Sequence, residues 1–303
     1  MCVGDECKDK EARDEGINRR SFLAGATAVV VGVGLGADSI ARQTPHPPSN
    51  ALNDQNVVQG MVSFKSGTAT VQGYQARPKA AGMYPAVVVM HGDFGIPDIN
   101  RYTAAVLAQN EFASLAIKRF SRYPELTIQD INKSDRTDRR YLSKAFNEEE
   151  LQDAQAAIDY LKGQPFVKRR KRVGVVGFCG GGLQALWLAT KSKDIKAIVT
   201  LYTPAGNSEQ FQDPHDPKPT LLDMVKQIKV PIQAHFGAAD AFTPVEDVKK
   251  FEQALRAQGT PIETFFYEGA KHAFCNYERP NYDAPACTLA LRRTLEFLKA
   301  QFR

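Results

Sequence analysis

The segment Gly177-Phe178-Cys179-Gly180-Gly181 combines a nucleophilic side chain with glycines at the positions where a sharp turn needs them. It follows an apolar run at 173–176 and precedes a helical pattern. This arrangement is typical of a nucleophile elbow, in which the central residue adopts a strained turn between a strand and a helix. The helix N-terminus would favour the thiolate of Cys179, and the backbone N–H of Gly180 could bind an oxyanion. The alternative is a buried cysteine in a tight glycine turn.

Two further residues could supply the base that a thiol nucleophile needs and the carboxylate that orients this base. Asp240 follows the apolar run at 232–236, and His272 follows an expected strand at 263–267. Both would therefore lie at carboxyl ends of strands, where parallel sheets bind ligands. The chain order nucleophile, acid, base is that of α/β-hydrolases and differs from the orders of chymotrypsin-like and subtilisin-like proteases. Taken alone, Asp240 could be a helix cap or turn residue, and His272 a surface loop residue.

The elements that would position these residues alternate between strands and helices. Two strand patterns, 57–64 and 68–74, flank the turn-forming Lys65-Ser66-Gly67 and predict an edge hairpin. Apolar runs without alternation, which are typical of buried parallel strands, lie at 86–90, 113–117, 173–176, 197–201 and 232–236. Helical patterns lie at 102–109, 148–162, 182–190, 245–258 and 287–301. The prediction is an α/β fold, with a mostly parallel central sheet, helices on both faces and an N-terminal edge hairpin.

Three segments, 177–182, 237–240 and 269–274, resemble the dienelactone hydrolase family, whose α/β-hydrolase members use a Cys-His-Asp triad. The similarity runs from about Val57 to the C-terminus. The matching triad residues are Cys179, His272 and Asp240. The resemblance implies a carboxymethylenebutenolidase-like carboxylic ester hydrolase that cleaves small activated esters or lactones through a thioester acyl-enzyme. It implies no cofactor, and the sequence has no CxxC or His/Cys spacing that would indicate a metal site.

The resemblance also assigns roles around the nucleophile. Asp93, in the loop after the first core strand, would give the second oxyanion N–H. Arg122 matches an arginine that holds a substrate carboxylate, and a plain surface arginine is the alternative. Tyr202 matches an aromatic pocket position, although it could equally belong to the core. His91 is expected to support its turn by hydrogen bonding and not to act as a second base.

Two positions depart from the family pattern. Well-known members carry a glutamate where this chain has Gly92, and a second carboxylate-binding arginine where it has Asn276. Loss of one guanidinium weakens bidentate recognition of an acidic substrate, so dienelactone itself need not be the substrate. Among the remaining residues, we expect Lys118 and Arg119 to be solvated and Trp187 to pack in the core.

The N-terminal segment is typical of a twin-arginine export signal. Arg19-Arg20 precedes a weakly apolar stretch at 24–37 that is rich in Ala, Gly and Val. This stretch is shorter than the roughly 18 to 20 residues that a membrane span requires, and Ser39-Ile40-Ala41 offers a cleavage site after Ala41. An uncleaved anchor or a cytoplasmic helix is the alternative.

The chain would therefore comprise a signal peptide at 1–41, a flexible linker at 42–55 and a hydrolase domain at 56–303. The twin-arginine machinery would export it to the periplasm or the medium, with membrane contact only during export. The net charge of +5 is modest for 303 residues. The basic cluster at 168–172 lacks interleaved aromatic residues, so we expect no nucleic-acid partner.

Five cysteines are present, and two of them lie in the predicted signal. Cys275 and Cys287 could pair in an oxidising compartment or could stay reduced and buried, and Cys179 is then the thiol that requires a functional explanation. Other functions are open on the same scaffold. They are a broad-specificity carboxylesterase or thioesterase, a non-catalytic binding protein, and a thiol redox sensor with Cys275 as the resolving cysteine.

Overall fold

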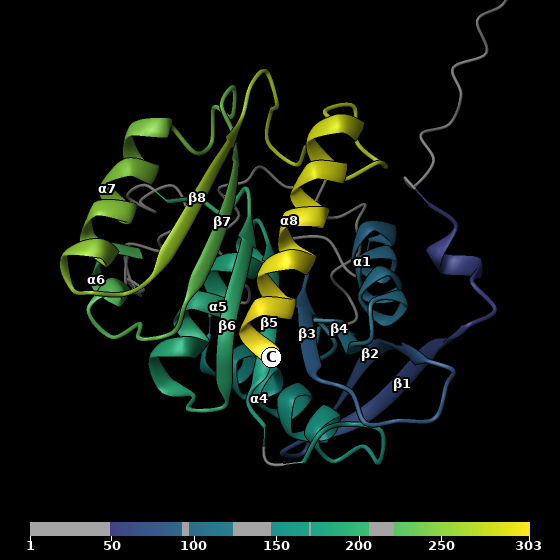
Figure 1. Ribbon diagram of the computed structural model, residues 1–303. Helices are drawn as coiled ribbons and strands as arrows, with labels where there is room; N and C mark the ends of the chain where they lie inside the picture. Colours follow the sequence, from purple (N-terminus) through teal and green to yellow (C-terminus); the bar gives the residue numbers. More distant parts are fainter. Residues whose placement is uncertain (1–48, 93–96, 124–146, 170, 206–220) are drawn as a thin grey trace, which may run out of the picture. The chain divides into compact units, whose positions relative to one another are not determined.

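The computed structural model describes residues 49–92, 97–123, 147–169, 171–205 and 221–303 (Figure 1). The predicted signal peptide, its cleavage site and Asp93 lie outside these residues. Within them, no helix is both long enough and apolar enough to cross a membrane.

A single sheet of eight strands organises the described residues. The strands are β1 (Val57–Ser66), β2 (Ala69–Pro78), β3 (Ala86–Met90), β4 (Ala113–Ile117), β5 (Val173–Phe178), β6 (Ile195–Leu201), β7 (Ile232–Gly237) and β8 (Ile262–Tyr267). Their order in the sheet is β1-β2-β4-β3-β5-β6-β7-β8. β1 pairs with β2 and β2 with β4 in antiparallel fashion, and the remaining pairs are parallel. The predicted mostly parallel sheet with an N-terminal edge hairpin is confirmed.

Helices cover both faces of the sheet (Figure 1). They are η1 (Ala51–Asn53), α1 (Asp98–Gln109), α4 (Glu148–Lys162), α5 (Gly180–Lys191), α6 (Leu221–Val225), α7 (Val245–Ala257) and α8 (Ala284–Phe302). Alternate residues of β3 belong to two separate cores: Val88 and Met90 belong to a core that also contains residues of α4, α5 and α7, whereas Val87 and Val89 belong to one that contains residues of α1 and α8. A strand covered on both sides needs apolar residues at every position, which explains its continuous apolar run. Trp187 lies in the first of these cores, as predicted.

The predicted flexible linker differs from the structure over its last residues. Ala51 is fully buried, and the side-chain amide of Gln59 donates to the carbonyls of Ala51 and Leu52. Ser49 contacts the hydroxyl of Tyr102 at 3.0 Å. The polar composition suggested a linker, but the apolar side chains of Ala51 and Leu52, together with Gln59 from β1, attach this turn to the domain. The short helix α6 was also missed, because five residues are too few to show a helical period.

The start of α4 matters for the site because this helix places two acidic side chains beneath it. Asn147 caps the helix by accepting a hydrogen bond from the backbone N–H of Glu150 at 2.8 Å. The resulting register turns Glu150 and Asp153 inward together with the apolar residues of the helix, and each is only 1% exposed.

Candidate active site

Cys179 occupies a strained turn between β5 and α5. Its φ of 51° and ψ of −123° are conformations that L-residues rarely adopt. Its N–H donates to the carbonyl of Leu201 at 2.9 Å, and its own carbonyl accepts from Gly182 at 3.0 Å. A Cβ at Gly181 would overlap the carbonyl oxygens of Met90 and His91. Only glycine therefore lets the start of α5 approach the end of β3 this closely.

The three predicted triad residues come together at the carboxyl ends of their strands. Nε2 of His272 lies 3.2 Å from Sγ of Cys179, and its Nδ1 lies 2.8 Å from Oδ2 of Asp240. The other carboxylate oxygen of Asp240 accepts the backbone N–H of Phe242 at 2.8 Å. Asp240 is 4% exposed, so few alternative partners compete for it. The arrangement can move a proton between sulfur and imidazole while the carboxylate holds the ring.

The surroundings of His272 favour its charged form. Burial works to lower the pKa of His272, but the negative charge of Cys179 and the hydrogen bond to Asp240 outweigh it and raise the pKa to about 10. Two aromatic rings meet the imidazole at steep angles, Phe242 at 5.1 Å and Tyr202 at 5.4 Å between centroids. An imidazolium beside a thiolate is the ion pair that a cysteine nucleophile requires.

Tyr202 belongs to both the core and the site wall. It is 3% exposed and has a φ of 41°, and its ring also packs against Phe178 and Phe274. Burial, together with the nearby charge of Cys179, raises the pKa of Tyr202 well above its usual value. Tyr202 can therefore be a core residue and still lie beside the site. Its role in substrate binding stays a prediction.

A disulfide attaches the loop that carries His272 to the last helix. It joins Cys275 to Cys287, near the start of α8. Within the same loop, the side-chain amide of Asn281 donates to the carbonyl of His272 at 3.2 Å. Asn276, at the family's second arginine position, uses its side-chain oxygen to accept the N–H of Glu278 at 3.0 Å. This position therefore stabilises a turn.

The predicted oxyanion donors are only partly described. Gly180 is buried and is the first residue of α5, so its N–H lies among those that a helix leaves without an intrahelical partner. Asp93 lies outside the described residues, and its role stays a prediction. Its neighbour Gly92 lies against Cys179, because an added Cβ there would be 3.0 Å from the Cβ of Cys179.

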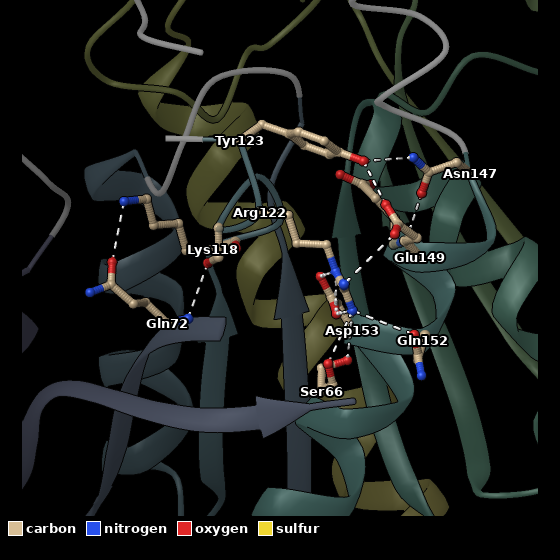
Figure 2. A network of polar contacts seen from close by, with 11 residues as sticks. Ser66, Gln72, Lys118, Arg122, Tyr123, Asn147, Glu149, Gln152 and Asp153 are labelled. Atoms are coloured by element: carbon tan, nitrogen blue, oxygen red, sulfur yellow. Dashed lines mark hydrogen bonds and ion pairs between the residues drawn. The ribbon is translucent and has the colours of Figure 1, made fainter. Parts of the chain in front are cut away.

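Arg122 is engaged by the protein itself (Figure 2). Its Nε donates to both oxygens of Asp153 at 3.0 and 2.9 Å, and its Nη2 reaches Asp153 at 2.7 Å and the carbonyl of Ser66 at 3.2 Å. Glu149 lies 3.8 Å from Nη1. To bind a substrate carboxylate, Arg122 would have to give up Asp153. Its predicted substrate role is therefore in competition with an internal ion pair.

The expectation that Arg119 is solvated is wrong. The residue is 2% exposed, and its guanidinium pairs with Glu150 at 2.8 Å. Burial raises the pKa of Glu150 to about 7, against the opposing effect of Arg119. The basic run around Arg119 looked like a surface loop because its acidic partner lies far along the chain. The ammonium group of Lys118, by contrast, donates to the side chain of Gln72 at 3.3 Å (Figure 2).

His91 behaves as predicted, since its ring supports the turn after β3. Burial, helped by the charge of Arg119, lowers the pKa of His91 to about 3 and keeps the ring neutral. Among the described residues, no group of three or more His, Cys, Asp or Glu side chains is arranged to hold a metal ion. Sequence reasoning missed Phe242, which packs on His272, although its place two residues after Asp240 could have suggested it.

Comparison with known proteins identifies a family for this chain. The model of the "Dienelactone hydrolase family" matches residues 71–302. A protein of Bradyrhizobium sp. named "Probable 2-oxo-3-(5-oxofuran-2-ylidene)propanoate lactonase" is 31% identical over 227 residues, which cover 75% of this chain and 88% of that protein. A "Putative carboxymethylenebutenolidase" of Methylorubrum extorquens is 26% identical over 269 residues, covering 88% of each chain.

A solved structure supports the fold. It is the "Putative Dienelactone Hydrolase" of Klebsiella pneumoniae, which superposes with a TM-score of 0.68 at 24% identity over 80% of this chain and 98% of that one. The predicted α/β-hydrolase fold is thus confirmed. The family match spans most of the chain, and the two relatives are named as a carboxymethylenebutenolidase and a lactonase. This chain is therefore a hydrolase that belongs to the dienelactone hydrolase family.

Proposed function

We propose that the enzyme hydrolyses small activated esters or lactones, with Cys179 as nucleophile. The thiolate attacks the carbonyl carbon, and the N–H groups of Gly180 and Asp93 stabilise the oxyanion that forms. As the C–O bond breaks, the His272 imidazolium gives its proton to the departing oxygen, which leaves a thioester on Cys179. Water then attacks the thioester with His272 as base, and the acid product and the thiol are released.

The observation that carries this proposal is the continuous contact from sulfur to imidazole to carboxylate. The two distances, 3.2 and 2.8 Å, lie within the range for proton transfer and ring orientation. The strained backbone at Cys179 supports it further, because such strain persists mainly where function requires it.

The chemistry of sulfur narrows the substrate class. A thiolate is a better leaving group than an alkoxide, so the tetrahedral intermediate of a simple alkyl ester tends to revert to reactants. The tetrahedral intermediates of esters with a stabilised leaving oxygen, such as enol lactones and aryl esters, instead break down to the thioester. The names of the relatives, a lactonase and a carboxymethylenebutenolidase, point to the same class.

A second candidate is a broad-specificity carboxylesterase that accepts neutral substrates. Two observations favour it. Arg122 is already paired with Asp153, and Asn276 stabilises a turn at the position where an arginine could have bound an anion. Paired aryl esters that differ only in a free carboxylate separate the two. A lactonase of acidic substrates should prefer the anionic member in kcat/KM, whereas the carboxylesterase should prefer the neutral one.

The test of the nucleophile compares the parent with Cys179→Ala on p-nitrophenyl acetate and on an enol lactone. We expect the alanine variant to lose turnover while its melting temperature stays close to that of the parent. Rapid quenching of the reaction of the parent should trap an acyl group on Cys179. Mass spectrometry should detect this group as added mass on the peptide that contains Cys179. Full activity of Cys179→Ala would exclude the mechanism, and a dead parent would favour a non-catalytic binding protein.

Export is a separate proposal, and we place the mature enzyme in the periplasm or the medium. The paired arginines Arg19-Arg20 support it, as does the Cys275–Cys287 disulfide, because such bonds persist in oxidising compartments. Cell fractionation should find the parent outside the cytoplasm and an Arg19→Lys, Arg20→Lys double variant inside it. Equal distribution of the two would contradict the proposal.

A further inference from the structure

A buried ion pair behind the nucleophile connects α4 to α5 and to the segment after β4. Arg119 donates from Nη2 and Nε to Oε2 of Glu150 at 2.8 and 3.2 Å. Both side chains are 1% exposed. The same carboxylate oxygen accepts the side-chain amide of Gln184, on α5, at 2.8 Å. Glu150 therefore orients the guanidinium relative to α5, the helix that directly follows Cys179.

The opposite side of the guanidinium binds the backbone after β3. Its Nη1 donates to the carbonyl of His91 at 2.8 Å and to that of Gly92 at 3.0 Å. The His91 ring adds to this, since its Nε2 accepts the backbone N–H of Arg119 at 3.0 Å. The proton of the neutral ring must then reside on Nδ1, which donates to the Gly92 carbonyl at 2.7 Å. Two donors thus hold one carbonyl oxygen.

That carbonyl belongs to a residue that lies beside Cys179. A Cβ on Gly92 would be 3.0 Å from the Cβ of Cys179 and 3.7 Å from its Sγ. The sequence predicts an oxyanion donor in the loop that begins at this point, so the donors that fix the Gly92 carbonyl act on the backbone that leads into that loop.

We propose that Arg119, oriented by Glu150, is a positioning residue of the reaction: it sets the orientation of the Gly92 peptide beside Cys179 and does not touch the substrate. The proposal rests on the proposed function, because an oriented peptide matters only where an oxyanion forms. A planar guanidinium suits the task, since it can bind a carboxylate on one edge and two carbonyls on the other. Stability alone explains the pair poorly, because apolar residues of similar volume often replace buried ion pairs without loss.

The chain offers a matched control. Asp153 lies one turn after Glu150 on α4 and is equally buried, and it pairs with Arg122, three residues after Arg119. This second pair therefore joins the same two segments. The contacts drawn for Arg122 lead to α4 and to Ser66 of β1 (Figure 2). Asp153→Asn thus removes a buried carboxylate, as Glu150→Gln does. Its partner is Arg122, whereas the contact with the Gly92 carbonyl is made by Arg119.

The experiment compares the parent with Arg119→Lys, Glu150→Gln and Asp153→Asn. It measures kcat and KM for p-nitrophenyl acetate, the rate of Cys179 alkylation by iodoacetamide, and the melting temperature. Alkylation displaces iodide at a saturated carbon, so it reports on the sulfur and His272 but needs no oxyanion donor. We expect kcat to fall about 10- to 100-fold in Arg119→Lys and Glu150→Gln, with KM and alkylation unchanged. Asp153→Asn should keep the kcat of the parent.

A further variant, Arg119→Ala, offers rescue. Guanidinium chloride at millimolar concentration should restore part of its kcat, because the free cation can occupy the space between Glu150 and the two carbonyls. Rescue supports the proposal even if Arg119→Lys folds poorly.

Other outcomes would overturn it. A parent-like kcat in both Arg119→Lys and Glu150→Gln excludes the positioning role while leaving Cys179 as nucleophile. An equal loss of kcat in Asp153→Asn, or a parallel fall in alkylation, shows a general structural role instead. If the parent itself shows no turnover that depends on Cys179, the proposed function fails, and the positioning role fails with it.

Discussion

Removal of the disulfide between Cys275 and Cys287 should cost stability more than activity. The bond closes a loop across 12 residues in sequence, and this loop begins three residues after His272. Both cysteines are fully buried. In the chain-entropy model, a cross-link stabilises the fold because it restricts the unfolded chain, and the effect grows slowly with loop length. The perturbation is reduction of the bond, or the double variant Cys275→Ala, Cys287→Ala.

The magnitude follows from the loop. For roughly 12 residues the model gives about 3 kcal/mol at 25 °C. Each kcal/mol corresponds to about 2 to 4 °C in a domain of this size, so the melting temperature should fall by about 6 to 12 °C. Activity should suffer less, since other contacts still hold the base. Asp240 keeps its hydrogen bond to His272, and Phe242 and Tyr202 still pack on the imidazole. We expect kcat at 25 °C to fall by less than about tenfold.

Thermal unfolding followed by circular dichroism, with and without dithiothreitol, provides the assay. The reductant should lower the melting temperature of the parent and leave that of the double variant unchanged, which separates loss of the bond from the small cavities that alanine creates. A thiol-specific dye should count two more thiols in denatured protein after reduction than before. An identical thiol count before and after reduction, or a melting temperature of the parent that ignores the reductant, would refute the reasoning.

Two predictions concern His272. In Asp240→Asn, the amide oxygen would keep the Phe242 N–H and its NH₂ group would face Nδ1, which forces the wrong tautomer. We expect kcat to fall about 10³- to 10⁴-fold with KM and melting temperature little changed, and a loss below tenfold in steady-state kinetics would contradict the orienting role. The second prediction follows from the folded pKa of His272, about 10, which exceeds the unfolded value of about 6.5. The protonated ring therefore stabilises the fold fully below pH 6.5, and this contribution is lost as the pH rises through 10. Urea unfolding should show the advantage of the parent over His272→Asn shrinking across that interval, and a constant or growing advantage would argue against the raised pKa.

The elements that could be predicted from sequence are those whose burial leaves a periodic pattern. The strands at Ala86–Met90 and Ala113–Ile117 and the helix Glu148–Lys162 have the predicted bounds. The first two are covered on both faces, so they are apolar at every position. The positions of Cys179, Asp240 and His272 could be predicted for a related reason. Each follows a recognisable strand, and the carboxyl ends of parallel strands lie at one edge of the sheet.

Contacts between side chains that are distant in sequence were harder to predict. Arg119 and Arg122 lie in one basic segment, and composition does not show which of them is buried or what neutralises them. Phe242 and Tyr202 look like ordinary aromatic residues, and their contacts with His272 depend on how two loops meet. The attachment of Ala51 to the domain depends on Gln59, a polar residue that carries no apolar signal.

The sequence of α4 nevertheless contains a signal that indicates the buried ion pairs. Glu150 and Asp153 are three residues apart and share a helix face with Leu151, Ala154 and Ile158, which are buried. An acidic side chain on the apolar face of a helix is costly unless a cation meets it. Each of these two residues therefore requires a cationic partner, and Arg119 and Arg122, themselves three residues apart, supply the partners here. Acidic residues on an otherwise apolar helical face therefore predict buried cationic partners, and here one of these partners, Arg119, binds the backbone carbonyl of Gly92 beside Cys179.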